Sequence, residues 1–261
     1  MTDADSFDLP RLRIGLKPYR LYWFARLRST NDHAGRLRRA GRLFAPAAVL
    51  TGRQIAGRGR GKNTWWSDHG VLTVTFAIPL HDRLPPQELP LIAGLSIRQA
   101  AAEITGDDRI LLKWPNDLLY EDRKLAGVLC ERISNVDLIG IGLNVNVNPA
   151  DAPRDLRNQI TSLLRIGGKR LDMTTVLLAV ARNLRHNLRR RMEIPFSQFV
   201  REYSRHDALA GRRVTVLSGD EPAISGRCEG IDNTGRLLIR VRSKVHGIVA
   251  GMVTVIPSSS A

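Results

Sequence analysis

The chain contains only two cysteines, Cys130 and Cys228, among its 261 residues. Two cysteines cannot build a disulfide framework, and their spacing matches no zinc-binding motif. No stretch approaches the roughly 20 consecutive apolar residues that a membrane-spanning helix needs. The N-terminus is acidic and no apolar core follows it, which excludes a secretory signal peptide. We therefore expect a cytoplasmic protein with reduced thiols and no membrane partner.

Lysine and acidic residues are both scarce compared with arginine. Only six lysines occur, so arginine supplies 34 of the 40 basic residues, against 25 acidic residues and a net charge of +15. This balance favours an anionic partner, such as a nucleic acid, a nucleotide or an acidic protein. An arginine-rich surface set by genome composition fits the same numbers. Charge alone therefore does not choose a partner.

The hydrophobic pattern predicts a larger N-terminal domain with both helices and strands. Helices are predicted at residues 31–41, 89–105, 174–192 and 196–205. Strands are predicted at residues 47–53, 71–78, 110–113, 125–132 and 136–145, with a hairpin turn at Asp122 and Arg123. Residues 1–20 are expected to be mostly irregular, and residues 54–64 and 148–160 to form loops.

The composition changes near residue 207, where short strands and turns replace the helices. Strands are predicted at residues 212–217, 224–231, 237–241, 248–250 and 253–256. We therefore predict an α+β fold with two domains. Residues 1–207 would form a mixed β-sheet with flanking helices, and residues 208–261 a small SH3-like β-barrel.

A segment rich in glycine and arginine spans residues 57–65, with the sequence GRGRGKNTW. Its glycines let the backbone approach a ligand closely, and successive N–H groups can surround an anion. Its guanidinium groups can bind carboxylate or phosphate oxygens through paired hydrogen bonds. It lacks the ending of a P-loop and the glycine spacing of a Rossmann turn. A nucleotide-binding loop, an RGG-like nucleic-acid segment and a solvated loop all fit, and we expect mobility without a ligand.

Three further motifs follow, and each is weak on its own. In KWPND at 113–117, the proline ends a strand and is expected to place Asn116 and Asp117 in a turn at the strand end. In KLAG at 124–127, a lysine that opens a buried strand requires an anionic partner. In GIGLNVN at 140–146, alternate glycines indicate close approach by another backbone or a flat ligand. Solvated lysines and ordinary turn asparagines are the alternatives.

Together and in this order, these motifs make the chain resemble the biotin–protein ligase family. The matching segments are RSTN at 28–31, the GRGR segment with its tryptophan, KWPND, KLAG and GIGLNVN. The resemblance extends over about residues 22–256 and includes the small C-terminal β domain. Lipoate–protein ligases share the fold, but the GRGR segment and KWPND followed by KLAG resemble the biotin branch.

The resemblance implies a biotin–[acetyl-CoA-carboxylase] ligase. Such an enzyme activates biotin with ATP to biotinyl-5′-adenylate and releases pyrophosphate. It then transfers biotin to one lysine of a biotin carboxyl carrier domain, of acetyl-CoA carboxylase or a related carboxylase. Bringing the biotin carboxylate to the α-phosphate requires positive charge and Mg²⁺. The metal ligands, the particular carrier protein and the choice between monomer and homodimer stay open.

The resemblance also assigns roles to residues. The biotin-binding residues that it implies are Ser29, Thr30, Asn31, Gln54, Gly57, Arg58, Gly59, Arg60, Lys124 and Gly127. The ATP-binding residues that it implies are Arg58, Arg60, Trp65, Asn116, Lys124 and Asn144. The implied catalytic residues are Lys124, Arg60 and Asp117. Lys124 would lie between the carboxylate and the α-phosphate, and Asp117 would orient this network and assist deprotonation of the acceptor lysine.

The glycine- and arginine-rich segment departs from the family pattern at two positions. Many bacterial members have the form GRGRxGRxW, whereas this chain has Lys62 and Asn63 at the places of the second glycine and arginine. The result is similar to the GRGRGxNxW form of eukaryotic members. Lys62 is expected to supply charge for the missing arginine, and the oxygen that it reaches stays open.

Two other functions compete with this interpretation. A basic nucleic-acid-binding protein would explain the charge, the arginine-rich segment and the barrel, but not KWPND, KLAG and GIGLNVN. A lipoate or octanoate ligase would share the fold. Some family members repress transcription through an N-terminal winged helix, but the motifs here begin too close to residue 1 for one. We therefore expect no sequence-specific DNA binding and only weak, salt-sensitive association.

Overall fold

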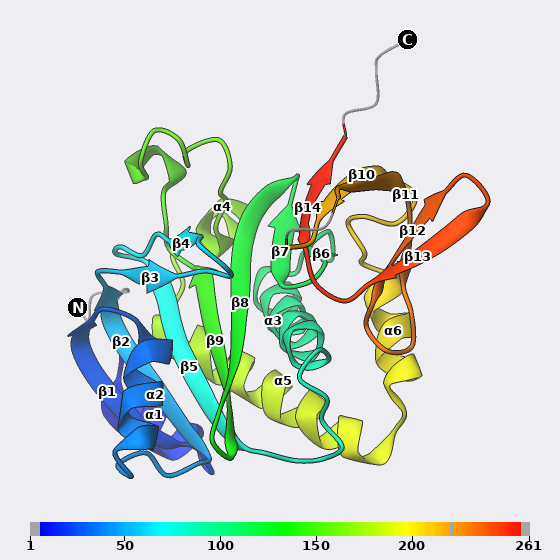
Figure 1. Cartoon of the computed structure of the whole chain (residues 1–261). Coiled ribbons are helices and arrows are strands. Elements are labelled where there is room, and N and C mark those ends of the chain that lie inside the picture. The colour runs from blue at the N-terminus through cyan, green and yellow to red at the C-terminus, as the bar shows by residue number, and fades with distance from the viewer. Residues whose placement is uncertain (1–5, 220–221, 257–261) are drawn as a thin grey trace.

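A mixed β-sheet forms the centre of the computed structural model, which describes residues 6–219 and 222–256 (Figure 1). Its strands are β1 (Arg20–Leu27), β2 (Ala47–Gln54), β5 (Val71–Pro79), β6 (Leu111–Lys113), β7 (Asp117–Tyr120), β8 (Arg123–Ile133) and β9 (Val136–Asn144). Their order is β1-β2-β5-β9-β8-β7-β6. β1 and β2 pair in parallel, and the other neighbouring pairs are antiparallel.

Helices cover both faces of this sheet (Figure 1). The helices are α1 (Leu9–Gly15), α2 (Thr30–Arg39), α3 (Leu89–Thr105), α4 (Leu163–Gly167), α5 (Met173–Glu193) and α6 (Phe196–Ser204), with a 3₁₀ turn at Pro149–Asp151. α3 and α5 pack together on one face, and α2 packs on the other. None of the described helices is long and apolar enough to cross a membrane.

The side chains of β9 show how the sheet separates its two faces. Ile139, Ile141 and Leu143 belong to the main hydrophobic core under α3 and α5. Leu138 belongs to a smaller core under α2. Because side chains alternate along a strand, Gly140 and Gly142 lie on the α2 face. They leave room there for the groups described below.

The C-terminal domain is a five-stranded antiparallel sheet. Its strands are β10 (Arg213–Leu217), β11 (Ile224–Ile231), β12 (Leu237–Val241), β13 (Lys244–Ile248) and β14 (Met252–Val255). Their order is β13-β12-β11-β10-β14. The indole N–H of Trp114 donates to the Gly235 carbonyl at 3.0 Å, and residues of both sheets share one hydrophobic core. The two domains are therefore packed together through apolar contacts.

The structure confirms the predicted fold class, but the N-terminal prediction was wrong. Residues 1–20 were expected to be mostly irregular; residues 1–5 lie outside the described residues, and α1 forms within the rest. Asp8 caps this helix by accepting from the Arg11 N–H at 3.0 Å, and Leu12 and Leu16 are fully buried. β1 follows and occupies the edge of the sheet. A seven-residue helix has too few turns for its apolar spacing to stand out.

Three predictions of local structure also need correction. The hairpin turn lies at Glu121 and Asp122, which both have positive φ, one residue before the predicted position. Asp117 opens β7 instead of lying in a turn, although Asn116 does lie in one. The strand predicted at 248–250 is β13, which ends at Ile248. Its polar residues and its pairing with β12 through a tight turn hid it from the hydrophobic pattern.

Candidate active site

A cavity of about 720 Å³ opens on the α2 face of the sheet. Its walls are the start of α2, a short hairpin of β3 (Gly57–Arg58) and β4 (Thr64–Trp65), and the C-terminal domain. Figure 1 shows this hairpin across the upper ends of β5 and β9, with β8 beside it. The glycine- and arginine-rich segment therefore forms one wall of a cavity that also reaches the second domain.

The floor of the cavity consists of residues that are small or lack a side chain. Thr73 and Gly142 are register partners on β5 and β9, and Gly127 of β8 pairs with Gly142 on its other side. A Cβ atom on Gly142 would lie 2.4 Å from the Trp65 indole, and one on Gly140 would lie 2.2 Å from the Asn31 amide oxygen. The predicted close approach therefore exists, and the side chains of Trp65 and Asn31 make it.

Polar residues at the start of α2 form the inner end of the cavity. The Thr30 N–H and hydroxyl both donate to Gln54 Oε1, at 2.7 and 3.1 Å. Asn31 donates to the Leu129 carbonyl and to Glu131, and its oxygen accepts from the Thr75 hydroxyl at 2.6 Å. These buried groups hold one another in place. A second lone pair on the Asn31 oxygen stays available for a ligand N–H.

Ser29 caps the same helix with its hydroxyl oxygen. That oxygen accepts from the Asp32 N–H at 3.3 Å, and Ser29 is 2% exposed. The hydroxyl hydrogen takes no part in this bond, so it can donate into the cavity. Thr73 Oγ1, on the floor, is buried and has no hydrogen-bond partner among the described residues. The inner end therefore offers two donors to a polar ligand.

Lys124 and Asp117 form an ion pair at the centre of the cavity. Lys124 Nζ lies 2.7 Å from Asp117 Oδ1 and 5.7 Å from the centroid of the Trp65 ring. Lys124 opens a buried part of β8, and the sequence analysis expected such a lysine to have an anionic partner. Asp117 is that partner. The indole N–H of Trp65 is buried without a partner among the described residues.

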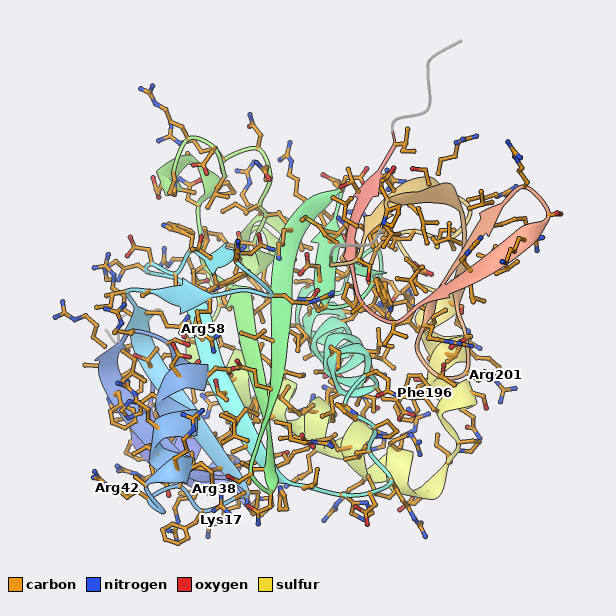
Figure 2. All side chains as sticks on the ribbon, in the orientation of Figure 1. Lys17, Arg38, Arg42, Arg58, Phe196 and Arg201 are labelled. Atoms are coloured by element: carbon orange, nitrogen blue, oxygen red, sulfur yellow. The ribbon has the colours of Figure 1, made fainter. Side chains whose placement is uncertain are left out.

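The two arginines of the hairpin have different environments. Arg58, which Figure 2 labels, pairs with Asp32 at 2.7 Å and with Glu131 at 2.8 Å. Arg60 is partly buried, and no carboxylate lies within 4 Å of it among the described residues. Burial lowers the pKa of Arg60, while the charge of Asp117 acts in the opposite direction. Arg60 is therefore a cation that faces the cavity without a counterion.

The other predicted site residues differ in how far their polar groups are already used by the protein. Asn144 Nδ2 donates to the Thr161 carbonyl at 3.0 Å, so its amide is partly used in holding the chain. Asn116 Nδ2 donates to the Val128 carbonyl at 2.8 Å. Gly57 is buried against the Trp65 carbonyl and does not line the cavity. The cavity brings together Ser29, Thr30, Asn31, Gln54, Arg58, Gly59, Arg60, Trp65, Asn116, Asp117, Lys124, Gly127 and Asn144.

Family models and known proteins match this chain over most of its length. A biotin/lipoate A/B protein ligase family model matches residues 23–148, and a biotin protein ligase C-terminal domain model matches residues 210–254. The biotin–[acetyl-CoA-carboxylase] ligase of Mycobacterium tuberculosis is 30% identical over 213 residues, which cover 78% of this chain and 77% of that protein. The chain belongs to the biotin protein ligase family.

Two further relatives show how much of each protein the match covers. The structure of biotin protein ligase from Aquifex aeolicus in complex with biotin and ATP has a TM-score of 0.82 and 30% identity, and covers 92% of this chain and 99% of that chain. The bifunctional ligase/repressor BirA of Bacillus subtilis is 30% identical over 210 residues. That match covers 77% of this chain and 63% of BirA, so the chain spans less than two thirds of that relative.

Several residues that line the cavity had no role in the predictions from sequence. Lys113 was seen in KWPND but given no role. Burial lowers its pKa, and Asp117 acts in the opposite direction. Thr73 was hidden inside a strand. The second domain also contributes residues 217–219 and 250–253, and only the fold brings these segments to the cavity.

Proposed function

We propose that this chain is an ATP-dependent biotin–protein ligase, which attaches biotin to one lysine of a biotin carboxyl carrier domain. The observation that carries the proposal is the convergence of Lys124, Asp117 and Arg60 in a single cavity. Two anions must meet in the first step of this reaction. The cavity offers two cations there, and a single carboxylate holds one of them in place.

In the first step, a biotin carboxylate oxygen attacks the α-phosphorus of ATP. The bond from that phosphorus to the bridging oxygen breaks, and pyrophosphate leaves. Lys124 would stabilise the negative charge that develops between the two reactants, because Asp117 fixes its ammonium group at 2.7 Å. Arg60 would neutralise phosphate oxygens, because no carboxylate lies within 4 Å of it among the described residues. Lys113 adds a third positive charge on the same side.

The inner end of the cavity would hold the fused rings of biotin. A ureido group has two N–H donors and one carbonyl acceptor. The Ser29 hydroxyl can donate to that carbonyl, and the Asn31 oxygen can accept from a ureido N–H. Gly140 would give Asn31 the room to lie against the sheet beside the rings. These groups are buried and already hydrogen-bonded to the protein, so binding does not have to order them.

In the second step, the neutral amine of the acceptor lysine attacks the acyl carbon of the adenylate. The new C–N bond forms, the C–O bond to AMP breaks, and the nitrogen loses a proton. Asp117 is the carboxylate in the cavity and is our candidate for the acceptor of this proton. The hairpin would cover the adenylate with Trp65 and exclude water from a reactive anhydride.

Magnesium fits this proposal as a companion of the nucleotide. No group of three His, Cys, Asp or Glu side chains within residues 6–219 and 222–256 could hold a metal ion. Mg²⁺ commonly binds through substrate phosphates and one or two carboxylates, and it would help to neutralise the triphosphate. Asp117 is the carboxylate that lines the cavity, and it is engaged with Lys124.

The direct test uses the purified chain with biotin, α-labelled ATP and an isolated biotin carboxyl carrier domain. We expect biotin-dependent pyrophosphate release, labelled biotinyl-adenylate and a carrier whose mass rises by one biotinyl group. Lipoate and octanoate serve as competing substrates. Adenylate formation with lipoate or octanoate, but not with biotin, would contradict the proposal and assign the chain to the lipoate branch.

A further inference from the structure

Much of the net charge of the chain falls within residues 9–67. Residues 9–67 contain 14 basic residues and one acidic residue, Asp32, which is paired with Arg58. This segment therefore carries a surplus of 13 positive charges, out of a net charge of +15 for the whole chain. The reaction proposed above uses only a few of these residues. The others need a separate explanation.

Two cations of α5 join this segment at the turn between α1 and β1. Arg185 of α5 donates to the Lys17 carbonyl at 2.7 Å, which brings α5 beside this turn. Burial raises the pKa of Tyr19 to about 12, and the nearby charges of Arg185 and Arg189 act in the opposite direction. Arg185 and Arg189 therefore lie near one buried tyrosine, and the turn that contains Lys17 lies beside Arg185.

The cluster continues past Arg20 to the loop after α2. The Arg20 guanidinium lies 5.3 Å from the centre of the Phe44 ring, and Phe44 is 56% exposed. The Phe44 N–H donates to the Tyr22 hydroxyl, which donates to the Arg42 carbonyl at 3.2 Å. We call this surface the basic end. It consists of Lys17, Arg20, Arg38, Arg42, Phe44, Arg185 and Arg189.

The basic end lies far from the cavity. Arg20 and Ala47 pair at the first residues of β1 and β2, whereas Gln54, at the last residue of β2, lines the cavity. An eight-residue strand separates its two ends by roughly 25 Å. Figure 2 shows Lys17, Arg38 and Arg42 together at the end of the molecule away from the hairpin. The proposed ligase reaction cannot involve this surface directly.

The cations of the basic end have no acidic partners of their own. Among the described residues, no carboxylate lies within 4 Å of any of its lysine or arginine side chains. Like charges held together repel one another, and a bound polyanion removes that repulsion. Arginine forks match phosphate oxygens. The ring of Phe44, with Arg20 over it, offers a flat surface on which a nucleic-acid base can stack.

These features favour nucleic acid over the other polyanions. An anionic membrane would be expected to meet a long amphipathic helix, whereas α1 has seven residues and a buried face. An acidic protein would bind the cations, but it has no base that would stack on the Phe44 ring beside Arg20. We propose that the basic end binds nucleic acid through its phosphate backbone, without sequence preference and independently of the active site.

The test compares two triple variants of equal charge. One replaces three side chains of the basic end, Lys17→Glu, Arg42→Glu and Arg189→Glu. The matched control replaces three exposed cations elsewhere, Arg201→Glu, Arg205→Glu and Lys244→Glu. Figure 2 shows Arg201 on the opposite side of the molecule from Lys17. Both variants should retain their circular dichroism spectrum and adenylate formation.

Fluorescence anisotropy with a labelled 20-nucleotide single strand of mixed sequence measures the binding. We expect the basic-end variant to bind at least tenfold more weakly than the parent at low salt, with a log–log salt slope smaller by roughly two. The control should lose less than about threefold. Saturating biotin and ATP should leave the affinity unchanged, because the cavity is a separate site.

Several results would overturn the proposal. Equal losses in both variants would mean that net charge, and not this surface, governs binding. Displacement of the oligonucleotide by biotin and ATP would place it in the cavity. Vesicles with phosphatidylserine, or a polyglutamate peptide, that bind the basic end more tightly than the oligonucleotide would identify another class of partner. Absence of any oligonucleotide binding by the parent chain would reject the surface outright.

Discussion

At the scale of single residues, the main feature of the cavity is the Lys124 ammonium group, whose position is fixed. Lys124 is tied to Asp117 at 2.7 Å and lies beside the Trp65 ring. A flexible lysine would have to be ordered each time substrates meet. Here the ion pair and the indole hold the charge in place before the substrates arrive, which is the condition under which such a charge lowers a barrier most.

Replacing this lysine tests the proposed role. We expect Lys124→Ala to fold and to form adenylate roughly 100- to 1000-fold more slowly, as when a single charge-stabilising donor is removed. Biotin-dependent pyrophosphate release measures the loss. Lys169→Ala, at an exposed position outside the cavity, is the matched control and should behave as the parent. Parental rates in Lys124→Ala would remove this residue from the mechanism.

Two glycines of β9 are as important to the cavity as its charged residues. Each lies where a side chain would occupy the space of a neighbour: Asn31 over Gly140 and Trp65 over Gly142. The Trp65 ring can lie against the floor of the cavity only because Gly142 has no Cβ. Position 142 therefore requires a residue without a Cβ atom, which only glycine provides.

We expect Gly142→Ala to weaken substrate binding while the fold persists. The new methyl group would lie 2.4 Å from the indole, so Trp65 must move off the floor of the cavity. KM values for biotin and ATP from initial rates should rise at least tenfold. Gly167→Ala is the control, because its methyl group would meet only the Thr105 methyl at 3.7 Å. Similar KM values in both variants would contradict this account of the floor.

At the scale of elements, contacts with α2 and β8 hold the β3–β4 hairpin more than its own strand pairing does. Its strands pair over only two residues each. Arg58 anchors it through ion pairs with Asp32 on α2 and Glu131 on β8, both of which are partly solvated. Solvated ion pairs contribute little to stability. We therefore predict that the hairpin tip, with Arg60 and Lys62, gains much of its order from an anionic ligand.

Limited proteolysis tests this dependence. We expect trypsin to cut after Arg60 or Lys62 at least several-fold more slowly when biotin and ATP are present, because the bound adenylate holds the hairpin down. Mass spectrometry identifies the cleavage sites. Cleavage after Arg242, in the exposed turn between β12 and β13, is the internal control and should not change. Equal rates at the hairpin with and without ligands would show that the ligands do not order it.

The elements also show where reading the sequence succeeds. The strands and helices with long apolar runs, such as β5, β9, α3 and α5, were predicted close to their observed bounds. The motifs that carry the family resemblance indicated the residues that line the cavity. Thr73 and the second-domain segments 217–219 and 250–253 were missed. Their role depends on which strand face or domain edge meets the cavity, and pairing between distant segments decides that.

At the scale of the whole molecule, the two domains meet along a seam beside the cavity. The Leu112 N–H donates to the His206 carbonyl at 2.7 Å, and the Ala208 N–H donates to the Leu112 carbonyl at 2.9 Å. Leu112 and Trp114 lie on either side of the cavity residue Lys113. The linker between the domains is therefore bonded to the strand that carries KWPND, so separation of the domains would disturb the site.

A buried carboxyl group in this seam makes the stability of the molecule depend on pH. Asp207 Oδ1 accepts from the Leu209 N–H at 2.8 Å, while Oδ2 is buried without a partner among the described residues. Burial raises the pKa of Asp207 from 3.8 to about 6. The native state therefore holds this proton more tightly than the unfolded state does. The resulting contribution to stability is present below pH 4 and is lost as the pH rises to about 6.

Asp207→Asn isolates this contribution, because the amide keeps the Oδ1 acceptor and cannot ionise. We expect the variant and the parent to have similar stability near pH 4. Above pH 6 the variant should be more stable by up to about 3 kcal/mol, since two pKa units correspond to roughly that free energy. Urea unfolding at a series of pH values measures the difference, in which other titrating groups such as His206 cancel. A difference that stays constant from pH 4 to pH 8 would mean that Asp207 does not titrate between these limits. The ionised Asp207 carboxylate would then not lower the free energy of unfolding.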